Sequence, residues 1–386
     1  MATNEMYELA FQYGATKLWA KLTDGELFAV RHTDGAIGYC CVMGNQGEHI
    51  ALADYVGEAA FQSYLRLAHA TDTQSVTPEL MWAQDCLQCS FEDAEDVSED
   101  ERKEAAVFAA KRGIHLKRRK AIPQFLRYRP FCQPWAVEDE LDQARLCEAL
   151  AAAKVLAELL KTHDKDSLRI VHLDDGPERI PLFGVKNGKM TMGSVELPAM
   201  TPPTYPAPAL RNDVTAERLR QGRRVGAMEC DVFLYPEPQE DGKGGAPRFP
   251  FLLLCVLQDE QEILNLPPVT DYETSAEDLV NYFAEAMAKD GRTPRELQVR
   301  DERTACLLRE LCERAEIPMR RVEALSLLDD LEDRMLSDLQ DEEELPQPAE
   351  SQEEYDRRML QELGSAFDGM SGGLGGFPFG DLPGED

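Results

Sequence analysis

The sequence lacks any long hydrophobic run. No stretch of about 18 apolar residues occurs among the 386 residues, so no transmembrane helix is predicted. The first residues, MATNEMYELAFQYGATKLW, also lack the basic start and apolar stretch of a secretory signal. These absences predict a cytoplasmic protein with no membrane partner.

Basic residues are scarce relative to acidic ones. The chain has 41 Lys and Arg against 72 Asp and Glu, a formal net charge of −31. A field of that sign repels phosphate backbones and anionic membrane surfaces. The composition therefore argues against a general nucleic-acid-binding protein, although a local basic segment can depart from the average.

The ten cysteines do not form a metal-binding or disulfide pattern. Cys86 and Cys89 form a CxxC pair, but no second CxxC or CxxH completes the four ligands of a structural zinc site. Residues three apart on a strand also point to opposite faces. We therefore favour buried reduced thiols, with a zinc or redox site at Cys86 and Cys89 as the alternative. A Cys41–His49 nucleophile pair has no local signature to support it.

The length exceeds one ordinary core and predicts several domains. Composition shifts and turn residues divide the chain into an α/β domain at 1–165, a β insert with a proline-rich linker at 166–227, a second α/β domain at 228–339 and an acidic, glycine-rich tail at 340–386. The tail's charge and glycine content predict disorder. The predicted fold class is α/β (α+β).

Both α/β domains are predicted to have the element order βββαβαβα. In the first, Asp-Gly and Asn-Gln-Gly turns separate three short strands, which favours an antiparallel meander. In the second, the predicted strands are residues 230–235, 249–257, 262–266, 296–300 and 319–322, and the predicted helices are 274–289, 302–315 and 325–339. A capping box of Thr274 and Glu277 is expected to open the first of these helices. The shared order suggests an internal duplication.

Several segments resemble known families. Tyr7-Glu-Leu-Ala-Phe11, Gly38-Tyr-Cys-Cys-Val-Met-Gly44 and Gln84-Asp-Cys-Leu-Gln-Cys-Ser-Phe91 resemble an uncharacterised bacterial family of unknown function. Pro294-Arg-Glu-Leu-Gln-Val-Arg-Asp-Glu302 looks like a second domain of unknown function that is often joined to it. Together the resemblances cover residues 6–338 and imply no activity.

The element order of the second domain is similar to the ribonuclease-H-like fold of nucleases and integrases. Those enzymes hold Mg²⁺ or Mn²⁺ on two or three convergent carboxylates. The candidate carboxylates here are Asp259, Asp301 and one of the helix acids Asp329, Asp330, Glu332 and Asp333. Family enzymes place the first Asp within the central strand, whereas residues 249–257, taken as that strand, have Leu252, Leu254 and Val256 there. This departure argues against catalysis, and no other cofactor is predicted.

One segment is basic, although the chain as a whole is acidic. Between residues 111 and 129 there is no acid, and aromatic residues follow closely. The basic residues are Lys111, Arg112, Lys117, Arg118, Arg119, Lys120, Arg127 and Arg129. Basic and aromatic residues together can bind single-stranded nucleic acid, here through residues 111–135. We favour the other interpretation, in which the segment docks on the protein's own acidic surface or on an acidic partner.

These observations predict a non-catalytic binding or scaffold protein with a protein partner. The alternative is a divalent-metal-dependent nuclease or nucleic-acid processing factor that uses the second α/β domain. A nucleic-acid mimic that exploits the acidity is a third hypothesis.

Overall fold

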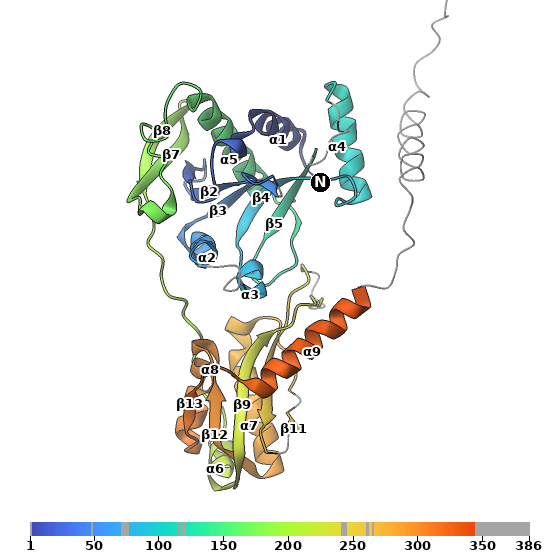
Figure 1. Ribbon diagram of the computed structural model, residues 1–386, viewed down its shortest axis with the longest axis vertical. Helices are drawn as coiled ribbons and strands as arrows, with labels where there is room; N and C mark the ends of the chain where they lie inside the picture. Colours follow the sequence, from blue (N-terminus) through green and yellow to red (C-terminus); the bar gives the residue numbers. More distant parts are fainter. Residues whose placement is uncertain are drawn as a thin grey trace, which may run out of the picture. The chain divides into compact units, whose positions relative to one another are not determined.

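A computed structural model describes residues 2–47, 49–70, 77–114, 116, 121–240, 245–259, 262–264 and 266–343 (Figure 1). The fold is mixed α/β with two sheets, both within a compact unit, Met1–Asp329; a second unit starts at Asp330. From residue 344 the predicted acidic tail lies outside the described residues. Among the described residues, no helix is long and apolar enough to cross a membrane.

The first sheet has eight strands in the order β6-β5-β4-β3-β2-β1-β7-β8. Neighbouring strands are antiparallel except β1 and β7, which are parallel. The meander predicted from the two turns is confirmed as β1, β2 and β3. The strands are β1 (Phe28–Arg31), β2 (Ile37–Met43), β3 (Ile50–Val56), β4 (Cys86–Glu92), β5 (Ile122–Tyr128), β6 (Trp135–Ala136), β7 (Arg179–Lys186) and β8 (Lys189–Glu196).

The β7–β8 hairpin extends this sheet. Its two-residue turn, Asn187-Gly188, has positive φ at both positions (54° and 72°), the conformation that suits a tight hairpin. Because β7 pairs with β1, the strands of the predicted β insert belong to the first sheet.

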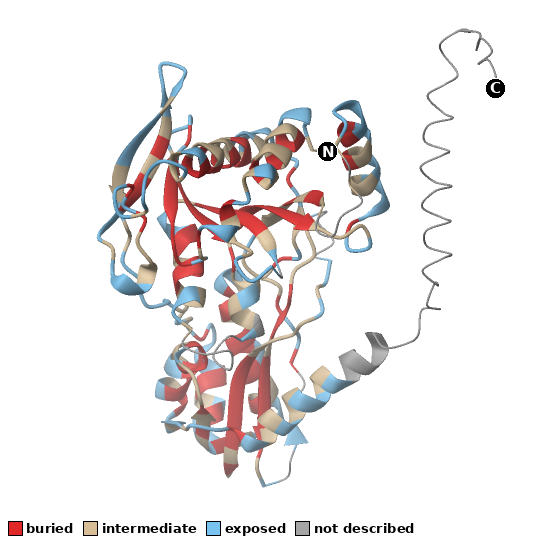
Figure 2. Ribbon diagram, turned by 45° about the horizontal axis from the view of Figure 1, so that its top comes forward, coloured by how far each residue is buried: buried red, intermediate tan, exposed pale blue. Residues whose placement is uncertain are grey.

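Helices cover both faces of the first sheet. Alternation along the strands sends Val42 and Leu52 to one core and Tyr39 and Ala53 to the other. The first core lies under α1 (Asn4–Thr16), α4 (Glu99–Lys111) and α5 (Glu140–Leu159), and the second under α2 (Glu58–Ala68). Figure 2 shows buried residues on the strands and on the inward sides of these helices. The remaining short helices are η1 (Leu18–Ala20), α3 (Pro78–Trp82) and η2 (Leu173–Asp175).

The second sheet has five strands in the order β11-β10-β9-β12-β13. The strands are β9 (Arg223–Leu234), β10 (Phe251–Leu257), β11 (Glu262–Ile263), β12 (Arg292–Val299) and β13 (Met319–Arg321). β9 is central, antiparallel to β10 and parallel to β12. The assignment of 249–257 as the central strand is therefore wrong. The predicted duplication is also wrong, because in the first sheet the fourth strand pairs with the third, whereas here it pairs with the first.

In the described residues, four helices accompany the second sheet: one precedes β9 in the chain, and the other three follow β11, β12 and β13. They are α6 (Asp213–Gln221), α7 (Tyr272–Asp290), α8 (Glu302–Ala315) and α9 (Ser326–Glu343). α7 is capped by Asp271, whose side chain accepts from the Thr274 backbone N–H, so the capping box predicted at Thr274 is not the start of the helix. The helix ends where Gly291 adopts a left-handed conformation, close to the predicted end at residue 289.

The core of the second domain depends on the apolar face of α7. Phe283 is fully buried there, next in sequence to Tyr282, which is 38% exposed. We expect Phe283→Ala to lower the free energy of unfolding by about 3–5 kcal/mol, because it removes buried surface and leaves a cavity. Tyr282→Ala is the matched control and should change the urea unfolding midpoint little. Equal effects of the two substitutions would contradict the orientation of α7.

Candidate functional site

The central strand of the second sheet carries two buried acids. Glu229 and Asp231 are only 2% and 5% exposed. They are two residues apart on β9, so both point to the same face of the sheet. Buried carboxylates need hydrogen-bonding or charged partners, and each has a distinct set.

Asp231 belongs to a group that we call the Arg300 cluster: Asp231, Arg300, Asp301, Thr304 and Asp329. Arg300 Nε contacts Asp231 Oδ2, and Arg300 Nη1 lies 2.5 Å from Asp329 Oδ1 on α9. The Thr304 hydroxyl donates to Asp231 Oδ1 at 3.1 Å. Burial raises the pKa of Asp231, the Arg300 charge opposes that rise, and the Asp301 charge adds to it. The guanidinium therefore joins the central strand to α9.

Glu229 holds the start of α9. Its Oε2 accepts the backbone N–H groups of Leu327 and Leu328 at 3.0 and 3.2 Å, and its Oε1 accepts from Gln258. The first N–H groups of a helix have no partner within the helix and favour a negative charge. Glu229 is thus a cap supplied from the sheet.

The candidate acids from the sequence are only partly brought together. Asp301 caps α8 by accepting from the Thr304 backbone N–H at 2.8 Å. Asp259 lies in the turn after β10, against Gly226, which is about 16 Å along β9 from Asp231 at the usual strand rise. Asp259 is therefore not part of the Arg300 cluster, and the predicted convergence of Asp259 with Asp301 is wrong.

The helix acids divide between the two compact units. Asp329 reaches Arg300, whereas Asp330 and Glu332 lie in the unit that starts at Asp330. The sequence interpretation missed Glu229 and Asp231 because it took the wrong central strand. The signal was present: two acids alternate with apolar residues within one strand, Met228-Glu-Cys-Asp-Val232.

The Arg300 cluster does not fit Mg²⁺ or Mn²⁺. Both oxygens of Asp231 are engaged by donors from Arg300 and Thr304, and one oxygen of Asp301 is engaged at the helix cap. A guanidinium charge also lies between Asp231 and Asp329, where it would repel a cation. Over the described residues, no group of three or more His, Cys, Asp or Glu side chains is arranged to hold a metal ion.

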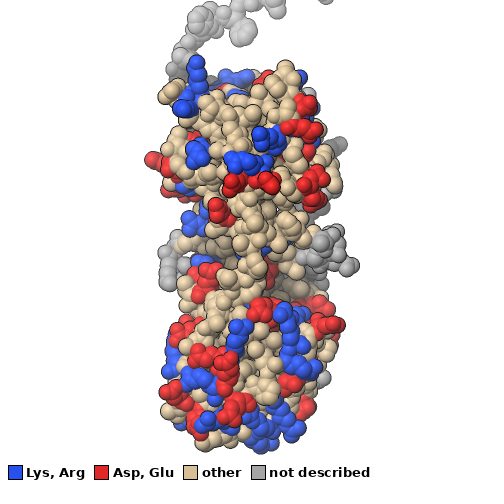
Figure 3. All heavy atoms as spheres, turned by 90° about the vertical axis from the view of Figure 1, so that its left-hand side faces the viewer, with Lys and Arg blue, Asp and Glu red and all other residues tan. Residues whose placement is uncertain are grey.

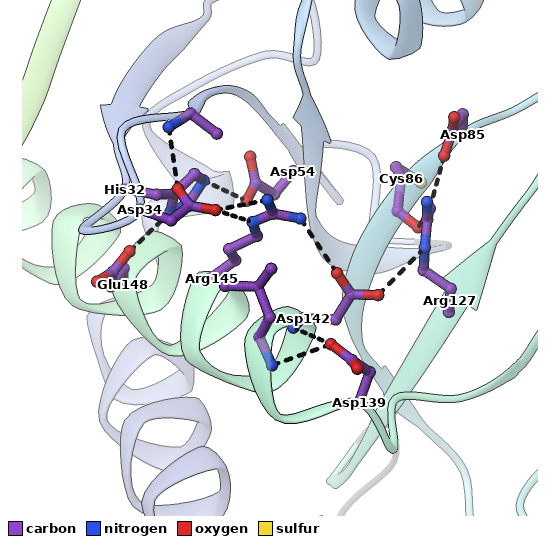
Figure 4. Close-up of polar contacts among 12 residues, drawn as sticks. His32, Asp34, Asp54, Asp85, Cys86, Arg127, Asp139, Asp142, Arg145 and Glu148 are labelled. Atoms are coloured by element: carbon purple, nitrogen blue, oxygen red, sulfur yellow. Dashed lines mark hydrogen bonds and ion pairs between the residues drawn. The ribbon is translucent and has the colours of Figure 1, made fainter.

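A second charged network lies under α5 on the first sheet (Figure 4). The His32 side chain is completely buried between two carboxylates. Its Nε2 is 3.1 Å from Asp54 Oδ2, and its Nδ1 is 2.8 Å from Glu148 Oε2 on α5. Gly38 gives this group its space, because a Cβ there would lie 1.9 Å from Asp54 Oδ1. The network joins β3 to α5 through one imidazole ring.

The charges around His32 determine its protonation. Burial alone would lower the pKa of His32, but hydrogen bonds and charges from Asp54 and Glu148 outweigh burial and raise that pKa above its usual value. Because one imidazole nitrogen faces each carboxylate, the doubly protonated ring can satisfy both.

Further ion pairs continue along the same helix (Figure 4). Arg145 on α5 pairs with Asp34 at 2.5 Å, and with Asp142 at 3.4 Å. Asp142 is also 3.5 Å from Arg127 of β5, which pairs with Asp85 at 2.7 Å. These pairs attach α5 to the sheet by charge along its polar side, while its apolar side enters the core.

The basic segment of the sequence is partly neutralised by the protein itself. Arg127 pairs with Asp85 and Asp142, and Arg112 pairs with Glu8 at 2.6 Å. Arg129 is exposed. The residues Lys117, Arg118, Arg119 and Lys120 lie outside the described residues.

The cysteine candidates are buried. Cys86 and Cys89 lie in different cores, on opposite faces of β4, so the two thiols cannot chelate one ion. Burial raises the pKa of both thiols. The Cys41 thiol contacts the Asp24 carbonyl, whereas His49 contacts Gln88 and Glu92, so no Cys41–His49 pair forms.

Together, the fold and these networks define a two-domain mixed α/β protein in which buried Asp231, Asp54 and His32 pair with side chains of the same chain, and buried Glu229 accepts hydrogen bonds within it. Comparison with family models gives two matches: residues 4–172 match a domain of unknown function (DUF7309), and residues 215–336 match a second domain of unknown function (DUF6930). The chain thus contains two matched domains of unknown function, at the two parts of the chain where the sequence resemblance placed them. Neither the curated proteins nor the solved structures gave a match.

The His32 network predicts a pH-dependent stability. A folded-state pKa above the unfolded value of about 6.5 means that the stabilisation is fully present below pH 6.5 and is lost as pH rises through the folded-state pKa. We expect the free energy of unfolding to fall over that window, and His32→Gln to remove this part of the dependence. His163→Gln, at an exposed histidine just after α5, should leave it unchanged. A wild-type profile that is flat or rises with pH would contradict the assignment.

The contacts of the Arg300 cluster predict that replacing Arg300 lowers the free energy of unfolding. Removing one partner of a fully buried ion pair costs about 3–5 kcal/mol, and the 30% exposure of the Arg300 side chain reduces this to roughly 1–3 kcal/mol for Arg300→Met. Adding Asp231→Asn should recover part of the loss, because no buried charge is then left unpaired. Arg309→Met, at an exposed pair with Glu302, should cost less than about 1 kcal/mol. Urea unfolding is measured for the wild type, Arg300→Met, Asp231→Asn, the double variant and Arg309→Met, and additive effects of the two single substitutions would refute the coupling.

Proposed function

We propose that this protein is a non-catalytic binding or scaffold protein with a protein partner. The observation that carries the proposal is Arg300, whose guanidinium lies between Asp231 and Asp329. A metal-dependent nuclease needs those carboxylates free to bind cations that activate water. Here an internal cation neutralises them.

The strand order of the second sheet supports a likeness to ribonuclease-H-like domains. The contacts of its buried acids do not support the metal-dependent chemistry of those enzymes. The first strand in the chain, β9, is central, and it carries Asp231 as such enzymes require. Thr304 and Arg300 donate to the carboxylate of Asp231, and the first backbone N–H groups of α9 donate to that of Glu229, so these acceptor oxygens are already engaged. A fold-level likeness is in any case a weak guide to function.

A protein partner is favoured over nucleic acid by the charges. The formal net charge of −31 opposes contact with a phosphate backbone. Arg112 and Arg127, two of the candidate cations, are engaged by acids of the same chain. On the face in Figure 3, Lys and Arg side chains are interleaved with Asp and Glu.

The runner-up is a divalent-metal-dependent nuclease or nucleic-acid processing factor. One observation favours it: Asp231, Asp301 and Asp329 come from the central strand, the end of the fourth strand and α9, and all three lie around Arg300 or Thr304. Movement of Arg300 out of the cluster would leave a carboxylate group of the required kind.

Calorimetric titration of the full chain with Mn²⁺ tests the proposal against the runner-up. We expect no saturable binding by the wild type, because Arg300 holds the carboxylates. Asp231→Asn is the variant that decides the site, and Asp213→Asn, at a 97%-exposed side chain on α6, is the matched control. Stoichiometric binding by the wild type that is lost in Asp231→Asn and kept in Asp213→Asn would overturn the proposal in favour of the nuclease.

A further inference from the structure

β8 forms one of the two outer edges of the eight-stranded sheet, opposite β6 (Figure 1). It is eight residues long, pairs with β7 on one side and has no described strand on the other. An open edge offers a row of unpaired backbone N–H and C=O groups, which proteins commonly protect with proline, a bulge or inward charges. β8 contains no proline, and its register with β7 runs without a bulge from Arg179↔Glu196 to Lys186↔Lys189.

The hairpin also exposes apolar side chains. Val185 and Met192 are 52% and 47% exposed. Met190 is opposite Val185, and Met192 is opposite Phe183, so all of these side chains lie on one face of the sheet. We call Val185, Met190 and Met192 the hairpin patch. The exposure of this hairpin is visible in Figure 2.

The turn determines which residues of β8 point their backbone groups outward. A two-residue turn makes its flanking residues, Lys186 and Lys189, a hydrogen-bonded pair. Hydrogen-bonded residues alternate along an antiparallel strand. Met190, Met192 and Ser194 therefore turn their N–H and C=O groups away from β7. The Ser194 carbonyl also accepts from Arg179 at 2.9 Å, which leaves its second lone pair.

We propose that β8 pairs antiparallel with β8 of a second copy of this chain, about a two-fold axis at Met192. Such an axis is perpendicular to the sheet and keeps each face on its own side, so opposed residues must share a face. A pairing centred on Met192 meets this condition and places Met190 opposite Ser194 of the second copy. The outward-facing backbone N–H and C=O groups of the two β8 strands can then hydrogen-bond to each other. The pairing also buries the two Met192 side chains against each other.

Charge supports a second copy as the occupant. The tip of the hairpin is basic, with Lys186 and Lys189, and its base has Glu178 and Glu196 beside Arg179. Antiparallel pairing about the two-fold axis places the basic tip of each copy beside the base of the other. The net charge of −31 on each chain repels a second copy. Physiological salt screens this repulsion, because the Debye length there is about 8 Å, so we expect the pairing under those conditions.

Sedimentation velocity of the full chain over a concentration series, at about 0.15 M salt, tests the pairing. We expect the wild type to shift from one chain mass to two as concentration rises. Met192→Lys places two like charges at the axis and should raise the dimer dissociation constant about tenfold or more. Met200→Lys is the matched control, because Met200 is also 47% exposed but lies after β8, and it should behave as the wild type.

A cross-linking variant covers the case in which Met192→Lys disturbs folding. In a hydrogen-bonded antiparallel pair the Cα atoms are about 5.5 Å apart, within disulfide range. Met192→Cys should therefore give a disulfide-linked dimer with oxidised glutathione, and Met200→Cys should not. A wild type that is monomeric at every concentration overturns the proposal. So does a dimer that Met192→Lys leaves unchanged and that Met192→Cys does not cross-link.

Discussion

The burial of acids on the central strand constrains the second domain more than any other interaction. Glu229 and Asp231 are on β9, which has another strand along each of its edges, and both side chains are buried. A buried carboxylate is costly without partners. Glu229 therefore requires the first backbone N–H groups of α9, and Asp231 requires Arg300 and Thr304. The positions of α8 and α9 follow from these needs as much as from apolar packing.

In the first domain, a histidine is the partner of a buried acid. Asp54 is completely buried on β3, and His32 lies between it and Glu148 of α5. The two domains differ in topology but share one arrangement: a basic side chain lies between a carboxylate from a strand and a carboxylate from a helix. Both arrangements use charges internally, which is consistent with the proposed role in binding rather than in catalysis. Surface-exposed features, above all the open edge of β8, then become the natural places for contact with other chains.

Part of this fold could be predicted from local sequence. The turns at Asp34-Gly35 and Asn45-Gln-Gly47 predicted the β1–β3 meander. The opposite facing of Cys86 and Cys89 also followed from strand periodicity. Strand order did not follow, because it depends on which distant strands pair. An apolar run such as residues 249–257 looks like a central strand, although in the sheet it is β10, beside the true centre.

The sequence by itself determined the fold class, the identity of most elements and the acidity, because these depend on short-range periodicity, turn residues and composition. Only the tertiary structure decided that Arg300 meets both Asp231, 69 residues before it, and Asp329, 29 residues after it, and that Asp259 does not join them. It likewise decided that His32 meets Glu148 across 116 residues. Such contacts depend on strand order and helix placement, and 72 acids offer many combinations that sequence spacing cannot distinguish.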